Sequence, residues 1–496
     1  MPYEIDYLAI TPEIVVAATA LVVLGLDLFL ARPSKYWTGV VAIIGMLGAA
    51  VPLIALAARD ETATMFDGSY VVDEFSLVLK GLFIAAAYLV LLMSVSYLES
   101  DRYWEGEYYF LLLASLLGAL VMASARDFIV MFVGLELVTG PLFLLTGWRK
   151  GDKRSNEAAL KFFLIGVLSA AILGWGMSFV YGLTGSVLFT EVSEAMGGVL
   201  ADEGTRAAGI LAIFFVIAGF GFKISAVPFH AWAPDTYQGA PLPVTAYLSV
   251  SSKAAGFVGL LVVLYQAFGS ASEIWGPAMW ILAALTMTLG NLSALGQTNV
   301  VRLLAYSSVA QAGFMLVPFA VAATEGGSLE EGFSATVIYI IIYAFMNLGA
   351  FATVIAASNR SGSADVSSFA GLSNRAPGIA VLASLFFFSL AGIPPLAGWY
   401  AKLVMFRSVI GTGEVWGVTL GVIAAVNAVI AFYYYAKVVK AMWFDTPEED
   451  AVDVDVPVSG SLRLALGLTI VMVFALGVLP GLADTLGRAT AILAGG

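Results

Sequence analysis

Long apolar segments constrain the fold of this chain more than any other feature. A membrane-spanning helix takes about 20 predominantly apolar residues. Fourteen segments are long enough, near residues 7–30, 36–58, 72–98, 107–124, 127–147, 157–183, 206–228, 241–268, 274–294, 300–323, 332–358, 377–412, 414–440 and 461–485. The 496 residues are 60% hydrophobic and 12% charged, whereas soluble proteins carry about 25% charged residues. The sequence therefore predicts an all-α integral membrane protein with about 14 transmembrane helices.

Proline interrupts two of these segments in a related way. The run 377–412 is too long for one straight span and contains Gly392-Ile393-Pro394-Pro395, so we expect one broken helix rather than two crossings. FSLAGIPP, which begins at Phe388, resembles FKISAVPF, which begins at Phe222. The two copies would cross the membrane in opposite directions. Inverted repeats with broken helices are typical of transport folds. We therefore expect two inverted repeats of five helices, roughly spans 4–8 and 9–13, each containing a broken helix.

These repeats divide the chain into four expected parts. Residues 1–106 would hold helices 1–3, residues 107–268 the first repeat and residues 269–444 the second repeat. Residues 445–496 would hold an acidic cytoplasmic loop, near 445–460, and helix 14.

Basic residues are distributed unequally between the two sets of loops. One set holds 13 of them: Arg32, Lys35, Arg102, Arg149, Lys150, Lys153, Arg154, Arg302, Arg360, Arg375, Lys437, Lys440 and Arg463. The opposite set holds 4: Arg59, Arg126, Arg206 and Arg488. Because cytoplasmic loops are enriched in lysine and arginine, we expect the larger set in the cytoplasm. Both termini would then lie outside, in the periplasm.

The stretch from Phe220 to Gly256 places ionisable groups inside apolar, helix-like sequence. It contains Lys223, Lys253 and His230, the only histidine in the chain. A lysine at the centre of a membrane helix costs roughly 2.5–3.5 kcal/mol on insertion scales. Snorkelling to the interface works near helix ends, but Lys253 lies about twelve residues into its helix. Functional roles are therefore the better interpretation.

Other charged residues within spans differ in their depth. Lys80 and Arg407 lie toward the outer ends of their spans, so we expect both to snorkel. Lys161 is about one turn inside its helix, and its position alone leaves its role open. Glu136 lies among apolar neighbours, about nine residues into its helix. It could be a neutral group bonded between helices or the partner of an intramembrane lysine.

The chain lacks the ligands for common redox centres. It has no cysteine and one histidine, which excludes a cysteine-ligated iron–sulfur cluster, a bis-histidine haem and a typical zinc site. We expect no cofactor in this chain and no electron transfer by it.

Four blocks of the sequence, in this order, resemble the N-subunit family of respiratory complex I, the proton-pumping NADH–quinone oxidoreductase. They are LELVTGPLFLLTGWRKGDKRSNEAALKFFLIG, FKISAVPFHAWAPDTYQGAPLPVTAYLSVSSKAA, QTNVVRLLAYSSVAQAGF and LAGIPPLAGWYAKLVMF, which fall within about residues 127–410. FHxWxPD alone would also admit cation/proton antiporter subunits, whereas TYQGAP favours the N family.

The resemblance implies a proton-translocating, antiporter-like subunit in the membrane arm of an enzyme complex in the bacterial inner membrane. Its proton relay would comprise Glu136, Lys161, Lys223, His230, Lys253 and Lys402. Lys223 would be the lysine partner of Glu136, and His230 would link Lys223 toward Lys253. Redox chemistry, with NAD(H), FMN, iron–sulfur clusters and quinone, would belong to other subunits. The implied partners are an antiporter-like M subunit, small membrane subunits and lipids, with no role for nucleic acid.

Two other functions stay open at this point. A subunit of a multi-subunit sodium/proton antiporter would need several intramembrane carboxylates or unwound carbonyls for an ordered sodium site, and only Glu136 is well placed. A non-transporting scaffold has no need for aligned intramembrane charges.

Overall fold

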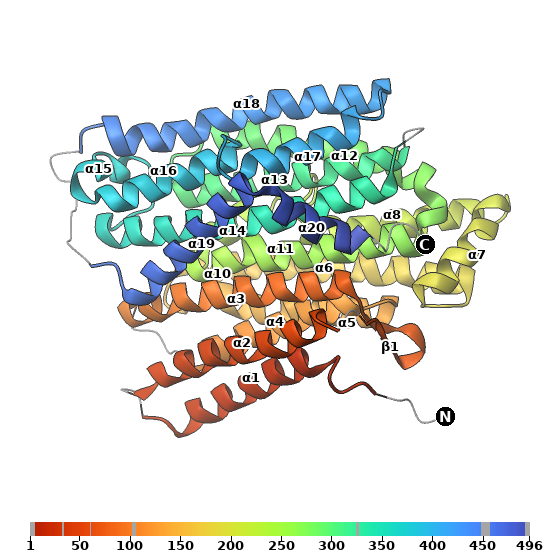
Figure 1. Ribbon diagram of the computed structural model, residues 1–496, viewed down its shortest axis with the longest axis horizontal. Helices are drawn as coiled ribbons and strands as arrows, with labels where there is room; N and C mark the ends of the chain where they lie inside the picture. Colours follow the sequence, from red (N-terminus) through yellow and green to blue (C-terminus); the bar gives the residue numbers. More distant parts are fainter. Residues whose placement is uncertain are drawn as a thin grey trace.

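A bundle of long helices, lying side by side with their axes roughly aligned, forms the computed structural model of the protein (Figure 1). The structure describes residues 5–31, 34–59, 61–101, 106–323, 327–447 and 457–491. Within those ranges, thirteen helical segments are long and apolar enough to cross a membrane. The broken run near 377–412 supplies one further crossing, so the predicted membrane fold is confirmed.

The long helices and the hairpin have the following bounds. They are α1 (Thr11–Phe29), α2 (Tyr36–Ala57), β1 (Ala63–Met65), β2 (Tyr70–Val72), α3 (Glu74–Asp101), α4 (Gly106–Ser124), α5 (Phe128–Thr146), α6 (Lys153–Thr184), α8 (Arg206–Lys223), α12 (Ser272–Leu295), α13 (Val300–Leu316), α14 (Leu329–Ser361), α18 (Val415–Phe444) and α19 (Gly460–Val478). The span at 242–267 combines α10 (Leu242–Tyr247), η3 (Leu248–Ser252), α11 (Lys253–Val262) and η4 (Val263–Ala267). Shorter elements are η2 (Phe66–Gly68), α7 (Phe189–Ala201), α9 (Ala233–Gly239), η5 (Gly269–Ala271), η6 (Val317–Ala323), η7 (Ser367–Phe369), α15 (Leu372–Arg375), α16 (Pro377–Ala391), α17 (Gly398–Ile410) and α20 (Pro480–Thr490).

Both predicted helix breaks are present, and each follows a residue with left-handed backbone geometry. The first lies between α8 and α9, where Ser225 has φ 58°. The second lies between α16 and α17, where Gly392 has φ 95°. The positive φ at Gly392 favours glycine, and an added Cβ atom would approach Lys402 Cδ to 2.8 Å and displace that side chain. The breaks leave carbonyl groups without helical partners near two intramembrane lysines.

The centre of the bundle is formed by the span at 242–267 and by α14. The apolar windows of both segments are entirely buried within the protein, whereas those of α1, α2 and α18 are about one third buried or less. A lysine on the 242–267 span therefore has no route to lipid or to the interface. This placement makes snorkelling impossible for Lys253, whose helix widens into a π-helical turn at η3 directly before it.

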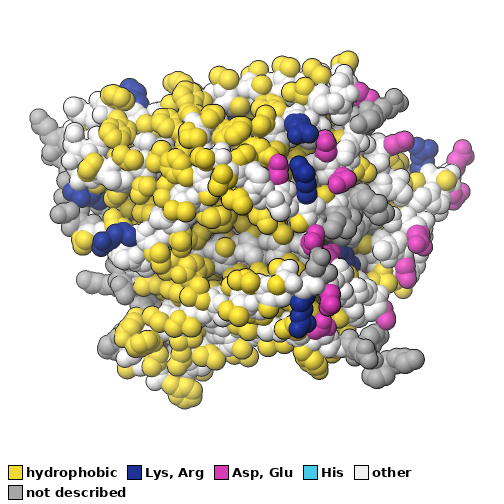
Figure 2. Space-filling model, viewed as in Figure 1, with side chains coloured by type: hydrophobic (Ala, Val, Ile, Leu, Met, Phe, Trp, Pro, Cys, Tyr) yellow, Lys and Arg dark blue, Asp and Glu magenta, His cyan; other side chains and the backbone are white. Residues whose placement is uncertain are grey.

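Charge is unequal between the two ends of the bundle. α1 begins and α20 ends at the same end (Figure 1). Acidic side chains gather toward the end where α7 lies, with basic side chains among them, whereas the charged side chains visible at the opposite end are basic (Figure 2). Arg32, Arg102 and residues 448–456 of the predicted acidic loop lie outside the described residues.

Three elements were not expected from the sequence. The connection between the expected spans 157–183 and 206–228 contains α7, whose buried face is formed by Phe189, Val192, Met196 and Val199. This spacing is a helical signal in a segment too polar overall to be recognised as a span. A small antiparallel hairpin pairs β1 with β2. The final apolar run is divided between α19 and α20, since Pro480 begins a new helix.

Candidate functional site

Glu136 and Lys223 meet where α8 ends against α5. The Lys223 Nζ atom lies 3.4 Å from Glu136 Oε1 and donates a hydrogen bond to Thr139 Oγ1 at 2.6 Å. The Lys223 side chain is 3% exposed and that of Glu136 is 32% exposed. The lysine is thus enclosed, while the carboxylate opens toward the surface of this chain. The structure brings the predicted pair together, with Thr139 as a third member that the sequence analysis missed.

Lys253 lies at the centre of the bundle and is bound by α13. Its Nζ atom donates to the carbonyl oxygen of Ser308 at 2.7 Å and to Ser308 Oγ at 2.6 Å. The hydroxyl of Tyr343, on α14, donates to the same Ser308 Oγ at 3.0 Å. Lys253 is 2% exposed. Its ammonium group is therefore bound by neutral oxygens, which accept hydrogen bonds but do not neutralise its positive charge.

Lys402, on α17, reaches back across the second break. Its Nζ atom donates to the carbonyl oxygen of Ala391 at 2.5 Å, the last residue of α16. The same atom lies 5.2 Å from the ring centroid of Phe314. The C-terminus of a helix carries partial negative charge, and an aromatic face attracts a cation. The break itself therefore supplies the binding site for the ammonium group.

Polar side chains occupy the region of α13 between Lys253 and the second break. Gln311 Nε2 donates to the carbonyl oxygen of Leu390 at 3.1 Å, and Tyr339 donates to Gln311 Oε1 at 2.6 Å. Ser307 Oγ lies 2.5 Å from the hydroxyl of Tyr435. These residues were not predicted from the sequence. Their signal is the spacing of Ser307, Ser308 and Gln311, which share one face of α13.

His230 lies in the first break, half-buried, between α8 and α9. Its Nδ1 atom is buried without a hydrogen-bond partner, and no contact among the described residues joins the ring to Lys223 or Lys253. The expected link between the two lysines is therefore not formed directly in this structure.

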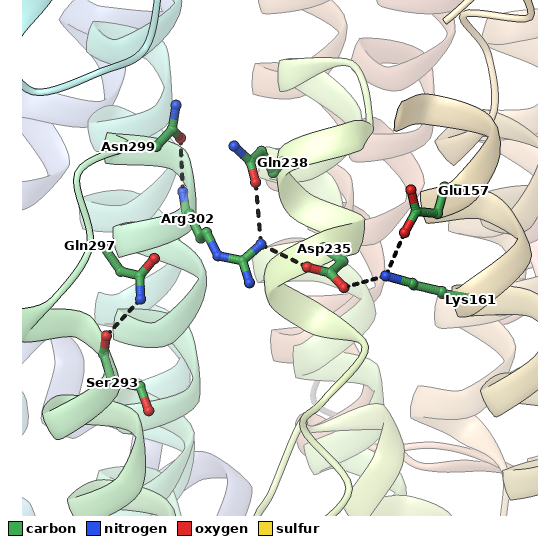
Figure 3. A network of polar contacts seen from close by, with 8 residues as sticks. All are labelled: Glu157, Lys161, Asp235, Gln238, Ser293, Gln297, Asn299 and Arg302. Carbon is green, nitrogen blue, oxygen red and sulfur yellow. Dashed lines mark hydrogen bonds and ion pairs between the residues drawn. The ribbon is translucent and has the colours of Figure 1, made fainter. Parts of the chain in front are cut away.

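Lys161 lies apart from the buried lysines, at the end of the bundle where α6 and α13 begin (Figure 3). Its side chain is 42% exposed and pairs with Glu157 Oε1 and Asp235 Oδ2, each at 2.7 Å. Arg302 approaches the other oxygen of Asp235 at 2.7 Å. Lys161 thus belongs to a polar network with Glu157, Asp235 and Arg302, which was not predicted from the sequence. We call this end of the bundle, where α6 and α13 begin, its mouth.

Two cations control the charge of Asp235 at this mouth. Partial burial alone would raise the pKa of the carboxyl group. Hydrogen bonds from Lys161 and Arg302, together with their positive charge, outweigh burial and lower the pKa of Asp235. The carboxylate is therefore held ionised.

Lys80 contradicts its prediction, whereas Arg407 agrees with it. Arg407 is exposed. Lys80 is fully buried, and its Nζ atom lies 2.8 Å from Glu13 Oε1, which also accepts a hydrogen bond from Tyr70. The expectation of snorkelling was wrong because Glu13, in the first turn of α1, supplies a carboxylate inside the bundle. No group of three or more histidine, cysteine or acidic side chains among the described residues could together hold a metal ion.

Comparisons with known proteins agree with this architecture. The family model described as "NADH:quinone oxidoreductase/Mrp antiporter, TM" matches residues 125–427. The chain is 39% identical to "NADH-quinone oxidoreductase subunit N 1" of Koribacter versatilis over 96% of this chain and 93% of that protein. It is 42% identical to "NAD(P)H-quinone oxidoreductase subunit 2" of Trichodesmium erythraeum over 90% and 83% of the two chains.

Solved structures give the same result. A chain of respiratory complex I from Thermus thermophilus superposes with a TM-score of 0.76 at 30% identity, over 96% of this chain and 99% of the other. A chain of the Mrp complex from Dietzia sp. superposes with a TM-score of 0.85 at 20% identity, over 99% of this chain and 98% of the other. At that identity the second likeness shows the fold alone.

Proposed function

Because the chain belongs to the NADH:quinone oxidoreductase/Mrp antiporter family of membrane subunits, we propose that it is a proton-translocating membrane-arm subunit of a proton-pumping NADH–quinone oxidoreductase. The observation that carries this proposal is Lys253, an ammonium group that is enclosed at the centre of the bundle and, among the described residues, is bound by the oxygens of Ser308. In this proposal NAD(H), FMN, iron–sulfur clusters and quinone belong to other subunits, and this chain holds no cofactor.

The buried groups form three proton-binding positions with different partners. Lys223 shares its charge with Glu136, Lys253 with neutral oxygens, and Lys402 with the end of α16. When Lys223 separates from Glu136, its positive charge becomes uncompensated and repels the proton on Lys253. That proton moves along the polar side chains of α13 and intervening water to Lys402, from which it leaves. His230 exchanges protons near the first break, since its unperturbed pKa is close to neutral.

The exposure of Glu136 supports assembly with other membrane subunits. α5 presents an outward stripe that includes Ile129, Val133 and Leu144, each more than half exposed, and Glu136 lies on the same side. A carboxylate facing lipid is costly, so a neighbouring protein is expected to cover it. We propose that the partners include an M-type antiporter-like subunit and small membrane subunits, with lipid on the remaining surface.

A sodium/proton antiporter is less well supported. Sodium, like other hard cations, takes oxygen ligands, and a carboxylate would be expected at the central position. The partners of Lys253 and Lys402 are instead neutral oxygens and an aromatic ring. These positions suit ammonium groups that gain and lose protons.

We place the protein in the bacterial inner membrane, with the basic end of the bundle in the cytoplasm and both termini in the periplasm. The uneven distribution of lysine and arginine supports this orientation. Because the chain has no cysteine, a Lys150→Cys variant introduces a unique, exposed thiol for this chain. An impermeant thiol reagent should label it in inverted vesicles but not in intact cells, and labelling in intact cells would reverse the orientation.

The proposed function is tested at Lys253. Lys253→Met removes the ionisable group and should lower proton translocation coupled to quinone reduction by about two orders of magnitude, as for loss of a proton-transfer group. The measurement is proton uptake by inverted membrane vesicles containing the assembled complex. Lys440→Met removes a 66% exposed lysine and should leave the rate unchanged. Normal pumping by Lys253→Met would refute the proposal.

A further inference from the structure

The short helix α9 joins the network at the mouth of the bundle to the centre of the proposed proton path. It has seven residues, follows the first break and packs between α6 and α13. A helix of this length is not stable by itself. Its position is therefore set by the contacts that its side chains make with neighbouring helices.

One side of α9 is tied to both neighbours by a single carboxylate. Asp235 Oδ2 accepts a hydrogen bond from Lys161 on α6, and Asp235 Oδ1 accepts one from Arg302 on α13, both at 2.7 Å. Gln238, also on α9, accepts a second hydrogen bond from Arg302 at 3.2 Å. Figure 3 shows Asp235 between the two cations. Because α6 and α13 belong to different predicted repeats, this carboxylate bridges the two halves of the protein.

The opposite side of α9 reaches the partner of Lys253. Tyr237, two residues after Asp235, is fully buried, and its hydroxyl lies 3.5 Å from Ser308 Oγ. Ser308 is the residue whose two oxygens bind Lys253 Nζ. The backbone oxygen of Tyr237 accepts a hydrogen bond from Thr245, which ties α9 to the helix leading to Lys253. A shift of α9 would therefore disturb the surroundings of Lys253 directly.

We propose that Asp235 is a positioning residue that clasps α9 between α6 and α13 and so holds Tyr237 and Ser308 in place at Lys253. Isolated ion pairs at a surface contribute little. This carboxylate differs because two charge-assisted bonds from different helices fix an element that has no stability of its own. In this proposal Lys161 helps to hold Asp235 in place and does not carry protons with the buried lysines. The proposal rests on the proposed function, since it assigns a role only in moving protons through Lys253.

The test uses the complex assembled in membranes, with proton uptake and quinone reduction measured per assembled complex. Asp235→Asn keeps the size of the side chain but removes its charge, and should lower coupled proton uptake at least about fivefold, the lower range of coupling between sites. Asp235→Glu retains the charge and should recover most of the activity. Asp365→Asn is the matched control, because Asp365 is an exposed aspartate that bonds Asn299 near the start of α13 without contacting α9.

Combination with Tyr237→Phe separates positioning from a general loss of stability. If Asp235 acts through α9, proton uptake by the double variant Asp235→Asn/Tyr237→Phe should equal that of the single variant with the lower uptake. If Asp235→Asn fails to assemble, Lys161→Met and Arg302→Met each remove one tie and should each give a partial loss of proton uptake.

Three outcomes would overturn the clasp: additive losses of proton uptake in the double variant, a loss in Asp235→Glu equal to that in Asp235→Asn, or normal uptake by Asp235→Asn. If Lys253→Met loses pumping while Asp235→Asn retains it, the clasp is wrong and the proposed function stands. If Lys253→Met pumps normally, both fail.

Discussion

The two helix breaks hold their lysines with different kinds of partner. At the first break, Lys223 is the last residue of α8 and meets side-chain groups of Glu136 and Thr139. At the second, Lys402 follows the break on α17 and binds the backbone carbonyl of Ala391. A carboxylate can change its charge or rotate away, whereas the carbonyl at a helix end does neither. The comparison indicates that the first break can switch and that the second provides a fixed position for a cation.

The largest expected effect tests whether the first break is a coupled switch. Glu136→Gln removes the charged partner of Lys223, and Lys223→Met removes the cation that faces Glu136. Each change should lower proton uptake and the coupled rate of quinone reduction roughly tenfold or more, while assembly persists. The two losses should not add in the double variant, since either one disables the pair.

A conservative change provides the control for this pair. Glu136→Asp keeps the charge at a shorter reach and should retain part of the activity. The rates are measured in membranes carrying each single variant and the double variant. Strictly additive losses, or normal pumping by Glu136→Gln, would show that this break works no differently from the second.

A smaller effect is expected from a change of the backbone at the second break. Gly392→Ala places a methyl group 2.8 Å from Lys402 Cδ and 3.3 Å from its Nζ atom, at a backbone φ of 95°. The lysine must then leave the Ala391 carbonyl, a bond to a charged group worth about 1.5–3 kcal/mol. Proton uptake per assembled complex should fall about tenfold, which corresponds to ~1.4 kcal/mol.

Gly413→Ala is the matched variant for this experiment. Gly413 has a φ of 71°, and no atom lies within 4 Å of an added Cβ. It therefore shares the backbone strain, about 1–3 kcal/mol, without touching a lysine. Gly392→Ala should lower proton uptake and Gly413→Ala should not. Equal effects of the two variants would mean that strain alone, rather than the position of Lys402, explains the loss.

The sequence predicted the crossings, both breaks and the meeting of Glu136 with Lys223, because hydropathy and proline are local signals and an isolated buried charge requires a partner. The polar environment of Lys253 was not predictable in the same way. Ser308 and Tyr343 carry no signal of their own in the sequence, and only packing brings Ser308 to Lys253 and Tyr343 to Ser308. Asp235 likewise joins α6 to α13 through partners that are distant in the chain, since Lys161 is 74 residues and Arg302 67 residues away from it.

Lys80 shows how such a distant contact misleads an argument based on depth alone. Its distance from the end of its span allowed snorkelling, but Glu13, 67 residues earlier, draws the side chain inward. The pair resembles Glu136 with Lys223 in chemistry, yet it lies outside the two repeats, between α1 and α3. We therefore expect a structural role, in which the buried charges matter for stability and not for proton transfer.

The last and smallest effect on proton transfer is expected at this pair. Lys80→Met leaves Glu13 buried with Tyr70 as its remaining partner, and breaking a buried pair in this way costs about 3–5 kcal/mol. The assembled complex should become less stable to heat, while proton uptake per complex stays unchanged. Glu13→Gln combined with Lys80→Met removes both charges and should regain much of the stability, since replacing a whole buried pair is often nearly neutral. Lys440→Met breaks an exposed pair with Asp445 and should change stability by about 0–1 kcal/mol. A loss of pumping by Lys80→Met at normal thermal stability would contradict this division, and would place a second charge switch outside the two repeats.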